Sequence, residues 1–213
     1  MFELNKEFDI SVASGIGPEQ RSVLIIDNFY KNPDEVRQYC IDSPKKTRET
    51  HSHLIANFPG HRVFEDDYRV AKELKEQFRH WVSQPIWNSP RKTPDKWTAN
   101  GRVYDYFELS WNKAGFMCNI TNDSLMREFY KGLPHRDSID VMFACVIYLN
   151  TPEECKGGTR FYSWDKNDVY QVELSADMVY NRCVLYEADL YHMQWWEDGM
   201  FPDYDRMLQV LFI

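Results

Sequence analysis

Three residues of this sequence have the types and the spacing of a metal-binding group. His135 and Asp137 lie two positions apart in GLPHRDSID, ahead of a strongly apolar stretch, and His192 follows a second apolar stretch. If the first pair lies in extended chain, both side chains point to one side, because side chains alternate along a strand with a period of two. Two imidazoles and one carboxylate on one face of an octahedron can hold a first-row divalent metal and leave positions open for substrate and O₂.

Each of these residues also has an ordinary structural explanation. His135 and Asp137 could form a capped polar turn, and His192 could be a hydrogen-bonded histidine at the end of a strand. His51 and His53 form a competing H-x-H pair in RETHSHLIANF, but that segment has no strand pattern and no carboxylate at ligand spacing. His192 is the best third ligand, because it lies in the half of the chain that is rich in strands.

The elements that must position these residues are mostly strands. From Val103 onwards the chain consists of short β-branched and aromatic runs, separated by Gly, Pro, Asn and Asp. The runs are VYDYFELSW, FMCNIT, VMFACVIYLN, TRFYSW, DVYQVEL, NRCVLYEA and RMLQVLFI. VMFACVIYL is apolar on both faces, which predicts a central strand covered on both sides.

The N-terminal half predicts one strand and supporting helices. RSVLIID predicts a strand over Ser22–Asp27, and a helix follows with Asn32 as N-cap and Pro33 in its first turn. Apolar spacing predicts a second helix over Asp66–Ser83. The prolines of SQPIWNSPRKTPDKWTANGR then exclude a long regular element.

These elements predict an α+β fold that is mainly β. We expect residues 1–102 to supply a strand and helices that pack, within one compact unit, against a core of residues 103–213. The core is expected to be a double-stranded β-helix of the jelly-roll or cupin-like type, since this architecture protects the edges of short antiparallel strands.

The composition limits the partners and the compartment. The 213 residues carry a formal net charge of -8, which disfavours nucleic acid as a partner, because basic patches drive such binding. Five cysteines without a C-x-x-C pair favour a reducing compartment over a disulfide framework. No stretch has the roughly 20 apolar residues of a membrane span, and no signal peptide is recognised. We expect a soluble cytoplasmic protein with a small-molecule or peptide substrate.

An ordered set of segments resembles a known enzyme superfamily. PHRDS, YLN, GGTRFYSW, VLYEADLYHMQ and DRMLQVLFI resemble the iron(II)/2-oxoglutarate-dependent oxygenases of the prolyl-hydroxylase-like superfamily, over roughly residues 103–213. The resemblance implies that His135, Asp137 and His192 bind Fe(II). It also implies that O₂ and the cosubstrate 2-oxoglutarate are consumed, with release of succinate and CO₂.

The resemblance further implies a binding site for 2-oxoglutarate. Arg206 on the last strand would bind its C5 carboxylate, for which the guanidinium fork is suited. Tyr148 of YLN and Asn119 on the strand before H-x-D are further candidate contacts. Leu208 departs from the hydroxyl residue that many relatives carry, and the long gap between His192 and Arg206 requires WWEDGMFPDYD to loop out.

The implied reaction is the hydroxylation or a related oxidation of a C–H bond in an amino acid, a peptide or a small metabolite. Because Asp137 would occupy a coordination position, no vacancy is left for chloride, and halogenation is disfavoured. Two alternatives stay open: a metal-dependent dioxygenase on the same fold that does not use 2-oxoglutarate, and a non-catalytic binding module.

Two arginines and one insertion compete for functional roles. Arg160 follows the Gly157–Gly158 turn and could point inward, whereas Arg182 opens a strand and is expected in solvent. The Trp195–Asp205 insertion carries aromatic and acidic residues. We favour a solvated hairpin tip with buried aromatics, and a substrate lip that attracts an amine is the alternative.

Overall fold

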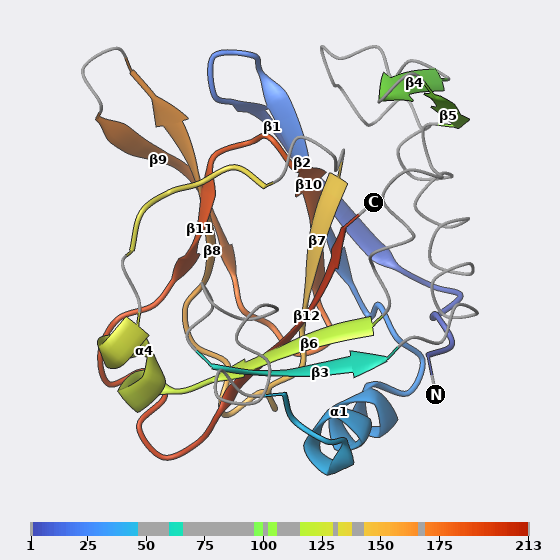
Figure 1. The fold of residues 1–213 in the computed structure, drawn as a ribbon, viewed down its shortest axis with the longest axis vertical. Coiled ribbons are helices and arrows are strands. Elements are labelled where there is room, and N and C mark those ends of the chain that lie inside the picture. The colour runs from blue at the N-terminus through green and yellow to red at the C-terminus, as the bar shows by residue number, and fades with distance from the viewer. Residues whose placement is uncertain are drawn as a thin grey trace.

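The computed structural model describes residues 2–46, 60–65, 96–99, 102–105, 116–129, 132–137, 143–165 and 169–212 (Figure 1). The predicted helix Asp66–Ser83, the pair His51 and His53, and the part of the VYDYFELSW run after Asp105 lie outside these ranges. The elements in chain order are β1 (Asp9–Ile16), β2 (Arg21–Asp27), α1 (Pro33–Asp42), β3 (His61–Glu65), β4 (Lys96–Ala99), β5 (Arg102–Asp105), β6 (Phe116–Thr121), α4 (Asp123–Phe129), β7 (Phe143–Tyr148), β8 (Gly158–Trp164), β9 (Tyr170–Asp177), β10 (Cys183–Glu187), β11 (His192–Trp195) and β12 (Arg206–Phe212).

Two antiparallel sheets form the body of the described chain. The larger has the order β1-β2-β10-β7-β12-β6-β3, and the smaller has the order β11-β8-β9. The segment 132–137 continues the smaller sheet, because His135 forms a bridge with His192 at the start of β11. From β6 onwards the chain passes back and forth between the two sheets, as in a jelly roll. The predicted double-stranded β-helix, mainly β, is confirmed.

The central strand of the larger sheet is β7. All six of its residues are buried, and it lies between β10 and β12. Its side chains alternate between two core clusters: Cys145 and Ile147 belong to one, Ala144 and Val146 to the other. The prediction of a central strand covered on both sides is therefore confirmed.

The two clusters lie on opposite faces of the larger sheet. One is shared with the smaller sheet through Phe161 of β8, and the other includes Val36 and Cys40 of α1. Helix α1 therefore packs against the larger sheet, as predicted for the N-terminal helices, and the second predicted helix lies outside the described residues. Pro33 is the first residue of α1, but the side chain of Asn32 at the N-cap makes no capping hydrogen bond to the described residues of this helix.

Five described elements were not predicted from the sequence, namely β1, β3, β4, β11 and α4. β1 extends the larger sheet beyond β2, β3 pairs with β6, and the short helix α4 follows β6 directly. β1 is an edge strand whose residues are mostly exposed, so its sequence has no buried face to produce a strong periodic signal.

All five cysteines are free thiols, in keeping with the predicted lack of a disulfide framework. Within the described ranges, no helix has the length and the apolar composition needed to cross a membrane.

Candidate metal centre

The H-x-D segment lies antiparallel beside the start of β11. The N–H of His135 donates to the carbonyl of His192 at 3.0 Å, and the N–H of His192 donates back to His135 at 2.9 Å. Two residues on, the N–H of Asp137 donates to the carbonyl of Ala188 at 2.8 Å. These bonds hold residues 135–137 in extended form, so that His135 and Asp137 share one side.

The structure brings together the three residues that the sequence singled out. One potential ligand atom from each of His135, Asp137 and His192 lies within 4.8 Å of the other two. Asp137 Oδ2 is 3.5 Å from His192 Nε2, and the two imidazole centroids are 4.6 Å apart. His192 is buried, Asp137 is half-buried and His135 is exposed, so the group is accessible from the side of His135.

The tautomer of His192 follows from its surroundings. Nδ1 lies 2.9 Å from the carbonyl oxygen of Leu190, where only a protonated nitrogen is favourable, so Nε2 keeps its lone pair on the side of Asp137. The ring packs against Tyr186, with centroids 4.7 Å apart. A ligating imidazole needs this arrangement, in which the second nitrogen donates to a carbonyl and fixes the ring.

Loss of solvation disfavours charge on all three side chains, including the His135 ring, although His135 as a whole is exposed. This loss raises the pKa of Asp137 to about 6, against the opposing effect of His135. It lowers the pKa of His192 to about 4, although the bond to Leu190 acts in the other direction. The pKa of His135 is also lowered, first by partial burial and then by His192.

The donor set fits a divalent transition metal. Asp137 Oδ2 is buried, and none of the residues that the structure describes donates a hydrogen bond to it, which is costly for a carboxylate unless another partner completes its environment. Two neutral imidazole nitrogens stand beside it, and a metal ligand must be deprotonated in this way. Two histidines and one carboxylate with accessible positions are the ligand set of non-haem Fe(II) sites.

Arg206 lies at the start of β12, directly after the loop of residues 196–205. The insertion therefore loops out, as the assignment of Arg206 requires. The side chain is 1 % exposed, and its guanidinium donates to Gln194 Oε1 and to the carbonyl of Gly158, each at 3.3 Å. Gln194 follows His192 by two residues on β11, so both point to the same side, about 7 Å apart along the strand.

Tyr148 and Asn119 flank Leu208 in one row of the larger sheet. Leu208 pairs with Asn119 on one side and with Tyr148 on the other, so all three face the smaller sheet. The hydroxyl of Tyr148 is 2.8 Å from Thr159 Oγ1, and burial raises the pKa of Tyr148 to about 12, so this phenol is protonated at neutral pH. Asn119 Oδ1 is buried and has no hydrogen-bond partner within the described part of the chain, which leaves an acceptor on the same face.

Arg160 and Arg182, the two other candidate carboxylate-binding arginines, do not lie in the interior beside Arg206. Phe161 is on the inner face of β8, so its neighbour Arg160 points outward, where its guanidinium lies 4.3 Å above the Trp195 ring. The expectation that Arg160 could point inward is wrong because of this alternation. Arg182 was expected in solvent, but its side chain is only 19 % exposed, and two nitrogens of its guanidinium bind the Asp27 carboxylate at 2.6 and 2.8 Å.

The Trp195–Asp205 insertion is attached to α4 by a buried carboxylate. Asp123, 1 % exposed, accepts hydrogen bonds from Trp196 Nε1 at 2.7 Å, from the N–H of Gly199 at 2.8 Å and from the N–H of Phe201 at 3.0 Å. Phe201 is buried, whereas the residues at the tip are exposed, as expected for a hairpin tip with core aromatics.

Sequence reasoning did not identify Asp123 or Gln194. Gln194 could have been found from strand periodicity, because it lies two residues beyond His192. Asp123 carries no comparable signal, because its partners lie more than 70 residues away in the sequence.

No known family's sequence model and no curated protein matches this chain. Among solved structures, the chain is similar to the crystal structure of a Pseudomonas putida prolyl-4-hydroxylase. The similarity has a TM-score of 0.42 and 15 % sequence identity, and it covers 90 % of this chain and 88 % of that chain.

Proposed function

We propose that this chain is an iron(II)- and 2-oxoglutarate-dependent oxygenase, which hydroxylates or otherwise oxidises a C–H bond of an amino acid, a peptide or a small metabolite. The observation that carries the proposal is the group of His135, Asp137 and His192, whose ligand atoms lie within 4.8 Å of one another. Two imidazoles and one carboxylate are the facial ligand set of Fe(II) oxygenases.

His192 Nε2, a ring nitrogen of His135 and the carboxylate of Asp137 would hold Fe(II). When bound, the metal would supply the redox chemistry that activates O₂ against a C–H bond while 2-oxoglutarate is converted to succinate and CO₂. The protein's own contribution begins with geometry. The backbone bonds between residues 135–137 and the start of β11 fix the spacing of the ligands, and the carbonyl of Leu190 fixes the His192 ring.

Arg206 supports the cosubstrate part of the proposal. It is a buried guanidinium on the inner face, and its partner Gln194 lies on the same side of β11 as His192. A five-carbon dicarboxylate could reach from the metal ligands to this guanidinium, which would bind the far carboxylate in a fixed orientation. Tyr148 and Asn119 would contribute neutral hydrogen bonds to the same molecule.

The surroundings would also exclude water from the interior. The rings of Phe161 and Tyr186 lie beside His192, with centroids 6.4 and 4.7 Å from its ring, and Leu208 separates Tyr148 from Asn119. Many members of the superfamily carry a hydroxyl residue at the position of Leu208. On this face of the sheet, the hydroxyls of Tyr148 and Thr159 would take over its hydrogen bond to the cosubstrate. Asp137 favours hydroxylation or desaturation over halogenation, because its carboxylate would fill the position that a halide needs.

Anaerobic titration with Fe(II) and 2-oxoglutarate tests the proposal. We expect a weak visible charge-transfer band in the wild-type protein and its loss in His135→Ala and Asp137→Ala. Arg206→Ala should retain Fe(II) affinity but weaken 2-oxoglutarate binding by about a hundredfold, which corresponds to the loss of a buried charge-assisted contact of about 3 kcal/mol.

Arg160→Ala is the matched control for Arg206→Ala, because it removes an arginine from the outer face of the same region. It should leave both affinities unchanged. A wild-type protein that binds no Fe(II) would refute the metal assignment. Equal 2-oxoglutarate affinities in Arg206→Ala and wild type would leave the metal assignment in place and refute the role of Arg206 in binding the cosubstrate.

A further inference from the structure

The loop between β10 and β11 supports two of the three metal-ligand candidates through its backbone. The carbonyl of Ala188 accepts the N–H of Asp137 at 2.8 Å, and the carbonyl of Leu190 accepts Nδ1–H of His192 at 2.9 Å. A turn closed by the N–H of Leu190 on the carbonyl of Glu187, at 2.9 Å, sets the path between them. The course of residues 187–190 therefore determines where both side chains point.

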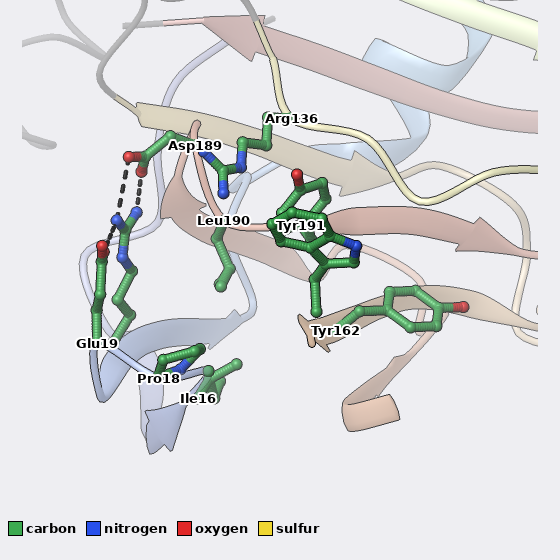
Figure 2. Close-up of a pocket in the computed structure, with 11 residues that line it drawn as sticks. Ile16, Pro18, Glu19, Arg136, Tyr162, Asp189, Leu190 and Tyr191 are labelled. Carbon is green, nitrogen blue, oxygen red and sulfur yellow. Dashed lines mark hydrogen bonds and ion pairs between the residues drawn. The ribbon is translucent and has the colours of Figure 1, made fainter. Parts of the chain in front are cut away.

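Glu187 and Asp189, the residues just before Ala188 and Leu190, are both acidic, and both bind Arg21. Nη1 of Arg21 is 3.0 Å from Glu187 Oε2. The carboxylate of Asp189 binds both terminal nitrogens of the same guanidinium, the second contact being 3.1 Å. Figure 2 shows the carboxylates of Glu19 and Asp189 directed at the guanidinium between them. One arginine thus fixes the loop at residues 187 and 189.

The centre of this ion cluster is buried, whereas its outer carboxylates are more exposed, with the side chains of Asp189 and Glu19 at 22 % and 59 %. The Arg21 side chain is 7 % exposed and that of Glu187 is 3 % exposed. The loop and the β1–β2 turn together border a cavity of about 110 Å³ (Figure 2). Because desolvation offsets most of the Coulomb attraction, a buried ion pair contributes little net stability, and it is better suited to defining a geometry.

We propose that Arg21 is a positioning residue of the metal centre: it holds Glu187 and Asp189, and thereby places the carbonyls of Ala188 and Leu190 that orient Asp137 and His192. The inference rests on the proposed metal-binding function. Outer partners that orient metal ligands typically change metal affinity by about ten- to a hundredfold when they are altered.

The protein contains a matched control for this arrangement. Arg182 binds Asp27 through two nitrogens, at 2.6 and 2.8 Å, and joins β10 to β2 at the opposite end of the same strand pair. Arg182→Lys therefore removes the same kind of bidentate contact between the same two strands, but it leaves residues 187–190 untouched.

The test compares Arg21→Lys, Arg182→Lys and wild type by Co²⁺ titration, thermal unfolding of the metal-free proteins and ¹⁵N spectra of the histidine side chains. Arg21→Lys should bind Co²⁺ at least about tenfold more weakly than wild type. It should also lose the signature of His192 protonated at Nδ1. Arg182→Lys should keep both, even where the two variants lose similar thermal stability.

If Arg21→Lys does not fold, Asp189→Asn takes its place, because it keeps the shape of the acceptor and weakens the bidentate contact. The inference is overturned if Arg21→Lys, or Asp189→Asn in its place, binds Co²⁺ like wild type and keeps the His192 tautomer. It is also overturned if the Arg21 and Arg182 variants lose Co²⁺ affinity equally. If the wild type binds no Co²⁺, the proposed function fails. The histidine spectra then still decide whether Arg21 positions His192.

Discussion

Replacing Asp123 by alanine removes one carboxylate that accepts three hydrogen bonds from the insertion before β12. The donors are Trp196 Nε1 at 2.7 Å, the N–H of Gly199 at 2.8 Å and the N–H of Phe201 at 3.0 Å. The insertion leads directly into Arg206, the proposed binding residue for 2-oxoglutarate. Asp123→Ala should therefore affect both the stability of the fold and the affinity for this cosubstrate.

The size of the effect follows from the number and burial of these bonds. A hydrogen bond to a charged group contributes about 1.5–3 kcal/mol, so three bonds summed independently give roughly 5–9 kcal/mol. Gly199 is exposed, so its N–H can bind water in the variant, whereas Phe201 is fully buried and its N–H loses its acceptor. Because bonds to one group are not additive, we expect a loss of about 3–5 kcal/mol in the free energy of unfolding.

Denaturant unfolding of the metal-free proteins measures this loss, with Asp198→Ala as the control. Asp198 also carries a carboxylate in the same loop, but its ion pair with Arg127 is exposed, with side-chain exposures of 63 % and 57 %. An exposed pair of this kind contributes little, so Asp198→Ala should unfold like wild type. Isothermal titration with 2-oxoglutarate, at a temperature where both variants are folded, should show weaker binding for Asp123→Ala alone.

Two results would refute this reasoning. If Asp123→Ala loses less than about 1 kcal/mol, the three hydrogen bonds do not hold the insertion in solution. If the variant loses the expected stability but binds 2-oxoglutarate like wild type, the insertion does not position Arg206.

Two further predictions concern proton competition and backbone geometry. Affinity for a divalent metal should fall about tenfold per pH unit below about pH 6, because Asp137, with a pKa of about 6, must then release a proton, whereas His192, with a pKa of about 4, is still neutral. Competition titrations between about pH 8 and about pH 5 measure this dependence, and a constant affinity across that range contradicts it. Gly158→Ala should lower the free energy of unfolding by about 3 kcal/mol, since its Cβ would lie 2.1 Å from the carbonyl oxygen of Ala176. In Gly199→Ala the Cβ meets no atom of the described residues within 4 Å, so only backbone strain of about 1 kcal/mol is expected, and equal losses in urea titrations would contradict the comparison.

The strands of the core could be predicted because buried positions require apolar residues, which gives these segments a recognisable sequence pattern. FMCNIT coincides with β6, and RMLQVLFI contains β12. VMFACVIYL contains β7, where consecutive residues enter different core clusters and both faces must be apolar. The sequences of β1 and α4 do not show such an apolar pattern. β1 lies at a sheet edge with mostly exposed residues, and α4 is a seven-residue helix with too few turns to show a periodic face.

The same contrast applies to the candidate metal centre. The period of two places His135 and Asp137 on one side of an extended segment, and this geometry is observed. Arg182 was misplaced because its partner Asp27 lies 155 positions earlier, and no local pattern indicates that pairing. Supporting contacts made by backbone carbonyls, such as that of Leu190, are equally invisible, because any residue type can provide a carbonyl.

The N-terminal strands are part of the sheet that supports the metal centre. β2 pairs with β10 from Ile26–Cys183 to Val23–Tyr186, and a buried or half-buried arginine closes each end of this pairing. At one end the contact fixes the start of β10, and at the other it fixes the loop that carries the carbonyls of Ala188 and Leu190. The H-x-D pair and His192 all come from the C-terminal half, but the orientation of two of these side chains depends on a loop that is held by a residue from the N-terminal half. A motif search restricted to the ligands would therefore find the donor atoms and miss part of what places them.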